Sequence, residues 1–280
     1  MRRAPPDGRA VAGRSTRLAA RLAAVLALAC SGAAVAHDTW FVPQPPSDRG
    51  EVVLALGTGT QYPKQEVSVL PEQVQAGGCI GDGVHERSLR RVAERPHALV
   101  LRTPRPVPAG VGLSCWARLV PIDIEIENAI VDVYFDEIRA SPALRERWAR
   151  LRAAGVKFRE TYVKHARIEL EGRAADAASA RAIDGMGLDA RIETLGRPLR
   201  VGQVVRFQLL RDGLPLAGQP VQLRSDLTPA GLWRVTDAEG RIELALPLAG
   251  RWMLRLTDLR AADGDRWASR FLTLGFDVLR

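Results

Sequence analysis

The sequence predicts a mainly β protein made of two β-sandwich domains with a short helical insertion between them. Three observations support this prediction: short segments of alternating apolar and polar residues, turns rich in Gly and Pro between them, and helical spacing confined to the middle third. Closely spaced strands at both ends favour antiparallel sandwiches over strand–helix–strand units. The expected domains are residues 37–125 and 188–280, joined by residues 126–187.

The first 36 residues have the features of an export signal. An apolar run from Leu22 to Ala29 follows a basic region, and Ala34-Val35-Ala36 provides the small residues that signal peptidase requires. The basic region contains Arg2, Arg3, Arg9, Arg14, Arg17 and Arg21. We therefore expect cleavage after Ala36 and a periplasmic protein that begins at His37.

Two alternatives concern the membrane. The apolar run is shorter than the about 20 residues that span a bilayer, so no transmembrane segment is expected after cleavage. Lipid attachment at Cys30 is less favoured, because Ala27 stands three positions earlier in place of the usual Leu.

Removal of the signal changes the charge of the chain. The precursor has a net charge of +8, and residues 1–36 hold six arginines and one aspartate. The mature chain keeps 34 basic and 31 acidic residues, a net charge of +3. Neither a block of like charges nor interleaved basic and aromatic residues is present, which argues against a nucleic-acid partner.

Two cysteines, Cys79 and Cys115, remain after cleavage. In an oxidising compartment we expect them to form one disulfide bond, which would stabilise the fold mainly by restricting the unfolded chain. Two reduced buried thiols are the alternative. A metal site is a third possibility, although the spacing differs from the close pairs typical of zinc sites.

The expected strands and helices follow in order. The first strand begins near Trp40 and Phe41. Four more strands are predicted in the first domain: Glu51–Leu56, Glu86–Val92, Ala98–Arg102 and Leu113–Val120. In the middle third, apolar residues from Ile126 to Phe135 fall near helical spacing. Ser141 and Pro142 open a second helix that ends near Gly155.

A strand over residues 157–170 and an exposed loop over residues 174–186 lead into the second domain. Its predicted strands are Arg191–Leu195, Val204–Leu210, Val221–Ser225, Trp233–Thr236, Ile242–Ala245, Trp252–Leu256 and Arg270–Val278. Asp212-Gly213 is a strong hairpin signal between two of them.

Several segments of the mature chain resemble a family of bacterial periplasmic proteins. They are His37–Pro43, Arg49–Val53, Glu160–Ala166, Leu199–Gly218, and Thr236–Arg241 leading into Ala249–Trp252. That family is a domain of unknown function often labelled as the periplasmic component of an ABC-type cobalt or nickel uptake system. The resemblance implies a transition-metal ligand, with a membrane transporter or an outer-membrane receptor as partner.

The last segments are also similar to the prealbumin-like module, an immunoglobulin-like sandwich. Its pattern is seen in the stretch from Gly213 to Val221, in Thr236-Asp237 with Gly240-Arg241, and in Ala249–Trp252. The resemblance implies structural roles: Asp237 and Gly240 form a turn, and Trp252 fills a core. Fold resemblance of this kind does not establish a function.

His37 at the processed terminus is the sharpest chemical feature. A terminal histidine offers its α-amino nitrogen and its imidazole Nδ1 to one metal ion in a closed chelate ring, which suits Cu, Ni or Co. The α-amino group has an ordinary pKa of about 7.7–8.0, so a metal needs to displace only one proton. An arbitrary, unstructured first residue is the alternative.

A second ligand must come from elsewhere in the chain. His165 is the predicted partner of His37, because it lies in one of the family-like segments. Glu66 is an oxygen-donor alternative. His85 and His97 stand among polar and charged residues, and we expect them to be solvated.

Enzyme motifs are missing from the sequence. It contains no Gly-x-Ser-x-Gly, His-Glu-x-x-His or Walker motif. An acidic stretch fits a solvated helix face better than a cation site. It consists of Glu125, Glu127, Asp132 and Asp136.

The favoured hypothesis is a non-catalytic periplasmic protein that captures or delivers a transition metal (Ni, Co or Cu). The alternative is a β-sandwich accessory module that binds protein or carbohydrate at the cell envelope. A copper oxidoreductase with the same terminal histidine is a third hypothesis, which the aromatic content of 5% makes less attractive.

Overall fold

The computed structural model describes Met1 and residues 37–280, with the exception of residues 82, 87, 171, 173–179 and 195–197. Residues His37–Arg280 form one compact unit. The predicted signal peptide, its cleavage site after Ala36 and the alternative lipid site Cys30 lie outside the described residues. So do residues 174–179 of the predicted loop at 174–186.

The protein is mainly β, as predicted, and its strands form three sheets. The N-terminal sheet contains β1 (Asp38–Gln44), β2 (Val53–Gly59), β3 (Val67–Ser68), β6 (Arg90–Arg95) and β7 (Ala98–Arg102). The small sheet contains β11 (Leu188–Ile192), β12 (Val204–Arg211), β13 (Leu214–Pro215) and β16 (Arg241–Ala245).

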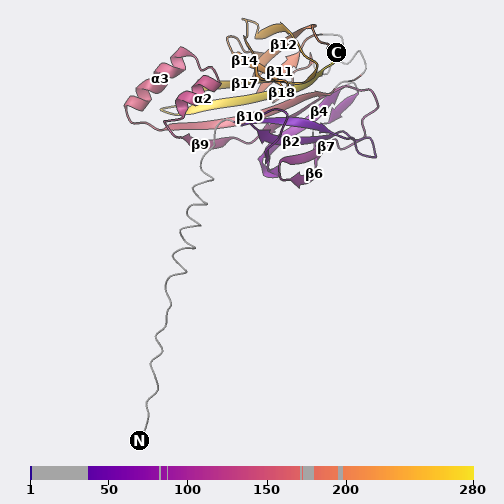
Figure 1. The fold of residues 1–280 in the computed structure, drawn as a ribbon, viewed down its shortest axis with the longest axis horizontal. Coiled ribbons are helices and arrows are strands. Elements are labelled where there is room, and N and C mark those ends of the chain that lie inside the picture. The colour runs from indigo at the N-terminus through magenta and orange to yellow at the C-terminus, as the bar shows by residue number, and fades with distance from the viewer. Residues whose placement is uncertain (2–36, 82, 87, 171, 173–179, 195–197) are drawn as a thin grey trace. The chain divides into compact units, whose positions relative to one another are not determined.

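The central sheet has nine strands and runs between the other two (Figure 1). Its order is β15 (Thr228–Val235), β14 (Pro220–Ser225), β17 (Gly250–Ala261), β18 (Trp267–Val278), β10 (Phe158–Leu170), β8 (Leu113–Leu119), β4 (Val74–Gly81) and β5 (Val84–Glu86). The ninth strand, β9 (Ile122–Ile126), also pairs with β10.

One parallel pair joins the two predicted sandwiches. β10 lies parallel to β18, with register from Glu160 opposite Trp267 to Ile168 opposite Gly275. On its other side β10 pairs antiparallel with β8 of the first predicted domain. The two sandwiches therefore share one sheet, which is why residues 37–280 form a single compact unit. The boundaries at residues 125 and 188 stay a prediction.

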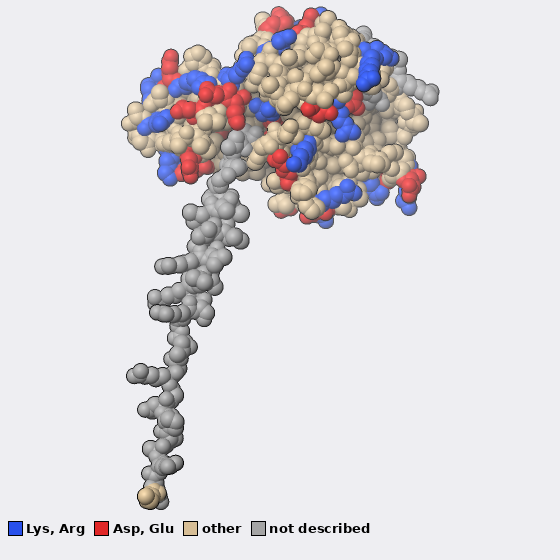
Figure 2. Space-filling model, viewed as in Figure 1, with Lys and Arg blue, Asp and Glu red and all other residues tan. Residues whose placement is uncertain are grey.

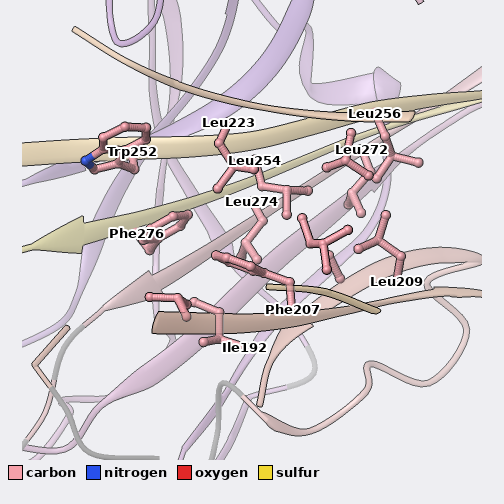
Figure 3. Close-up of a cluster of buried hydrophobic side chains, with 14 of the residues drawn as sticks. Ile192, Phe207, Leu209, Leu223, Trp252, Leu254, Leu256, Leu272, Leu274 and Phe276 are labelled. Atoms are coloured by element: carbon pink, nitrogen blue, oxygen red, sulfur yellow. The ribbon is translucent and has the colours of Figure 1, made fainter. Parts of the chain in front are cut away.

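The central sheet buries both faces. Its first face packs on the N-terminal sheet, with Leu54, Leu99, Cys115 and Ile168 in the shared core. Its second face packs on the small sheet, and Figure 3 shows this core. Phe207 and Ile192 of the small sheet meet Leu254, Leu274 and Phe276 of the central sheet there. Trp252 is fully buried in the same core, as its resemblance to the prealbumin-like module implies.

Two helices complete the first face. α2 (Val131–Glu137) and α3 (Pro142–Ala153) lie beside β9 and β10 (Figure 1). Aromatic side chains hold them on the sheet: Phe135 contacts Trp267, and Trp148 contacts Phe158, both with edge-to-face geometry. The predicted start of α3 is confirmed, since the hydroxyl of Ser141 accepts a hydrogen bond from the Leu144 amide.

The prediction of a helix starting near Ile126 was wrong, because Ile126 is the last residue of a strand. Ile122, Ile124 and Ile126 alternate with Asp123 and Glu125, and this period of two forms β9. Helical structure begins only at Val131.

Two turns have the structures that the sequence predicts. Asp212 and Gly213 both have positive φ, 51° and 79°, and connect β12 to β13 as the predicted two-residue hairpin turn. The Asp237 carboxylate accepts hydrogen bonds from the amides of Glu239 and Arg241, so it builds the expected turn before β16.

The disulfide bond between Cys79 and Cys115 is present. The two cysteines face each other directly across β4 and β8, and both are fully buried in the core beneath the N-terminal sheet. Within the described residues, no helix is both long enough and apolar enough to cross a bilayer.

Candidate functional site

His37 lies at the start of β1, on the first face of the central sheet. Three contacts hold this end of the chain. The partly buried Lys164 ammonium donates a hydrogen bond to the His37 carbonyl at 2.7 Å, and Arg255 binds the Asp38 carboxylate at 2.7 Å. The Thr273 hydroxyl donates to the Thr39 carbonyl. These contacts arise because Lys164, Arg255 and Thr273 project from adjacent strands toward β1.

His37 is half-buried and well anchored. Its main chain is fixed by β10, while Asp38 pairs with Gly59 of β2 in the N-terminal sheet. A residue tied to two sheets keeps its backbone in place even when the peptide bond before it is cut. The hypothesis that the first mature residue is unstructured is therefore weakened.

Burial controls the electrostatics around His37. It lowers the pKa of Lys164 to about 8, against the opposing effect of Asp38. Burial also raises the pKa of Glu137, at the end of α2, while the charge of Arg255 lowers it. Arg255 donates to the Asp38 carboxylate and to the Glu137 carbonyl, so Glu137 lies beside the residue that follows His37.

The surroundings of His37 carry no excess of negative charge. Three bases, Lys164, Arg224 and Arg255, stand against two acids, Asp38 and Glu137. A dication would therefore gain little from long-range attraction here, and binding would depend on the donor atoms themselves. On the face seen in Figure 2, charges of both signs are interspersed in the same way.

The structure does not bring His165 to His37. Lys164 and His165 are neighbours on β10, so their side chains point to opposite faces of the sheet. Lys164 reaches His37 on the first face. His165 is buried on the second face, where its Nδ1 lies 3.0 Å from the Phe271 carbonyl oxygen.

Glu66, the oxygen-donor alternative, lies at the end of the N-terminal sheet where β1 begins. The Asp38–Gly59 pair ends the register between β1 and β2, so Thr60 stands next to His37 at the sheet end. The Glu66 carboxylate binds the Thr60 amide at 3.2 Å and its hydroxyl at 2.9 Å. Glu66 is therefore held at the same end of the sheet as His37.

The other two histidines are exposed, and one of them contacts Glu66. The Nδ1 of His97 lies 2.7 Å from the carbonyl oxygen of Glu66, and His85 is exposed on the short strand β5. Among the described residues, no group of three or more His, Cys, Asp or Glu side chains is arranged to hold a metal ion. A site at His37 would thus rely on the α-amino nitrogen that cleavage creates.

Glu137 is the neighbour that the sequence did not indicate. It is one of several acidic residues around α2 that the sequence suggests are exposed. Only the packing of α2 on the central sheet brings it near His37. The four residues of the acidic stretch gave no such hint. Three of them form ion pairs: Glu125 with Lys157, Asp132 with Arg152, and Asp136 with Arg145.

Comparisons with known proteins give one partial family match and little else. No curated protein matches the chain. The Bacillus anthracis TIE protein, a solved structure, aligns with 96% of this chain at 10% identity and a TM-score of 0.20. This chain spans only 44% of the length of that protein, and at this score the likeness carries no argument. Residues 154–258, from just before β10 into β17, match the model of a family described as a domain of unknown function, DUF4198.

Proposed function

We propose that this protein is exported to the periplasm and binds a transition metal ion through His37, without catalysing a reaction. The observation that carries the proposal is the anchoring of His37 by Lys164 at 2.7 Å. Cleavage before His37 would place a free amine beside an imidazole on a fixed backbone. A membrane transporter or an outer-membrane receptor would then receive the ion.

Export is supported by two features. The compact unit begins at His37, the residue expected to follow the signal-peptide cleavage site. The Cys79–Cys115 disulfide fits an oxidising compartment such as the periplasm.

The donor set favours particular metals. Two nitrogens from His37 form the chelate, and the Glu66 or Glu137 carboxylate would be an additional oxygen ligand, since Glu66 binds Thr60 at the sheet end and Glu137 shares Arg255 with Asp38. Nitrogen donors favour Cu(II), Ni(II) and Co(II) over Mg(II) and Ca(II), which prefer oxygen ligands. The positive groups nearby also act against hard cations, which are held largely by charge.

The proposal is tested with protein purified from the periplasm, after mass spectrometry has established its first residue. Cu(II), Ni(II) and Co(II) are titrated into the wild type and the His37→Ala variant by calorimetry. Loss of one chelating nitrogen is expected to weaken binding by about tenfold or more, because even outer-shell changes cost 10–100-fold. Mg(II) is expected to give no signal at this site.

Two controls separate the chelate from unspecific binding. His85→Ala removes an exposed imidazole far from His37 and is expected to leave the affinity unchanged. Acetylation of the His37 α-amine blocks that nitrogen and keeps the imidazole, and the acetylated protein should bind as weakly as His37→Ala.

Equal affinities in the wild type and His37→Ala would overturn the proposed site. Cleavage at any position other than before His37 would do the same, because the chelate could not form. The accessory-module hypothesis, with protein or carbohydrate as ligand, would then take its place.

A further inference from the structure

A cavity lies on the second face of the central sheet, opposite to the face that carries His37. It has a volume of about 350 Å³, within the range of small-molecule sites. Two segments cover it: residues 182–187 before β11, and the turn at residues 210–213 after β12. Arg118 of β8 also lines it.

Three side chains from adjacent strands form the base beneath these loops. Arg118 lies directly opposite His165 in the β8–β10 register, and Arg270 on β18 projects from the same face. The arginines hold the covering segment: Arg118 donates to the Gly185 carbonyl at 3.1 Å, and Arg270 to the Gly187 carbonyl at 3.0 Å. The row of side chains is therefore fixed against the loop.

Most of the charges at the cavity are already paired. Asp189 accepts two hydrogen bonds of 2.9 Å from the buried Arg167, and Asp212 accepts one of 2.7 Å from Arg270. Two lining residues have no ion-pair partner among the described residues: Arg118 and the exposed Asp184. The cavity thus presents one unpaired positive charge and one unpaired negative charge.

One hydrogen-bonding atom at the cavity also lacks a partner among the described residues. The Nε of Arg118 is buried and bonds to nothing there. His165 lies beneath the covering segment, is 1% exposed and does not line the cavity. Its Nε2 lies 3.4 Å from the point where a side-chain carbon on Gly187 would stand.

The cavity therefore lacks one acceptor for Arg118. A buried donor left without a partner destabilises the protein, and a ligand that supplies an acceptor removes that penalty. The unpaired carboxylate of Asp184 at the same cavity favours a ligand that also carries a positive charge.

We propose that this cavity binds a small zwitterion of the α-amino acid type. The ligand carboxylate pairs with Arg118, and its ammonium group pairs with Asp184. This site is independent of His37, since it lies on the other face of the sheet and uses none of the same residues.

The proposal is tested by amide NMR of the purified protein with L-alanine as probe. Saturable shifts are expected at Gly185, Gly187 and Gly213, whose backbones surround the cavity. N-acetyl-L-alanine lacks the ammonium group and L-alaninamide lacks the carboxylate. Each is expected to bind at least about tenfold more weakly than L-alanine, the loss that one charge-assisted hydrogen bond predicts.

Variants locate the site. Arg118→Gln is expected to weaken L-alanine binding by about tenfold, and Asp184→Asn, an exposed change that leaves the fold intact, by a smaller factor. Arg234→Gln on the edge strand β15 is the matched control and should bind like the wild type. Absent or unsaturable shifts, equal binding of N-acetyl-L-alanine, or full affinity in both cavity variants would overturn the proposal.

Discussion

Lys164 and His165 show how one strand serves two environments. Both side chains are nearly buried, and burial lowers the pKa of each, to about 8 for Lys164 and about 4 for His165. Strand alternation directs Lys164 toward β1 and His165 to the opposite face of the sheet, beneath Gly187. Each keeps one backbone carbonyl as its partner, so neither is left without a hydrogen bond.

The buried His165 predicts loss of stability in acid. Its folded pKa of about 4 lies below the ordinary 6.5, so below pH 6.5 the unfolded chain takes up a proton that the folded protein refuses. Stability from this residue is complete above pH 6.5 and falls as the pH drops toward 4, by about 3 kcal/mol at most. Urea unfolding at pH 7.0 and 4.5 measures the difference.

The control for this pH effect is His165→Gln. Glutamine can donate to the Phe271 carbonyl as His165 does, yet it does not titrate in this range. The variant is expected to lose less stability than the wild type between the two pH values. An identical loss in both proteins would show that other groups, and not His165, cause the acid sensitivity.

The sequence predicted His37 for the candidate site but not its neighbours in the fold. The position of His37 after a cleavage motif is local information. Its proximity to Lys164, Glu137 and Glu66 depends on contacts between residues up to 127 positions apart. The His165 prediction failed for a local reason too, because residues 164 and 165 of one strand cannot serve the same face.

At the scale of elements, the disulfide joins two neighbouring strands deep in the sheet. Cys79 and Cys115 are 36 residues apart, and closing a loop of that length contributes about 4 kcal/mol by restricting the unfolded chain. Reduction with a thiol should therefore lower the free energy of unfolding by an amount of this order. Urea unfolding with and without reductant measures it.

A matched variant separates the disulfide from other effects of the reductant. The Cys79→Ala/Cys115→Ala protein has no bond to reduce, so its unfolding midpoint should not respond to the thiol. If the oxidised and reduced wild-type proteins unfolded at the same urea concentration, this would contradict the expected contribution of the disulfide bond to stability.

Elements with strong local patterns were predictable. β7 occupies the residues expected, Ala98–Arg102, and α3 begins at the predicted Ser141 cap. β4 was missed because Gly77, Gly78 and Gly81 obscure its apolar alternation, and the sheet tolerates them where backbones approach closely. The helix predicted from Ile126 was wrong for a different reason. The apolar residues of this segment fit both the helical period and the strand period of two.

On the scale of the whole molecule, the β10–β18 pair joins the two predicted sandwiches through one sheet. The predicted connection between two domains turned out to supply a 13-residue strand at the middle of the central sheet. Parallel pairing between strands this distant in sequence has no local signature, so the sequence could indicate two sandwiches and not their shared sheet. Arg167 adds to the link, since it pairs with Glu169 on β10 and Asp189 on β11 of the small sheet while fully buried.

The segment that matches the family model, residues 154–258, is therefore not expected to fold by itself. It contains β10 but lacks β18, the strand that pairs with both β10 and β17 and contributes Leu272, Leu274 and Phe276 to the core. Without β18 this apolar surface is exposed and two long strands lose their ladder partner. Residues 37–280 should unfold in one transition with coincident fluorescence and circular-dichroism curves, whereas the 154–258 fragment should show neither dispersed amide signals nor a cooperative transition. A fragment of residues 154–280 restores β18 and is expected to recover dispersed signals from the small sheet; a cooperatively folded 154–258 fragment would contradict the central role of the β10–β18 pair.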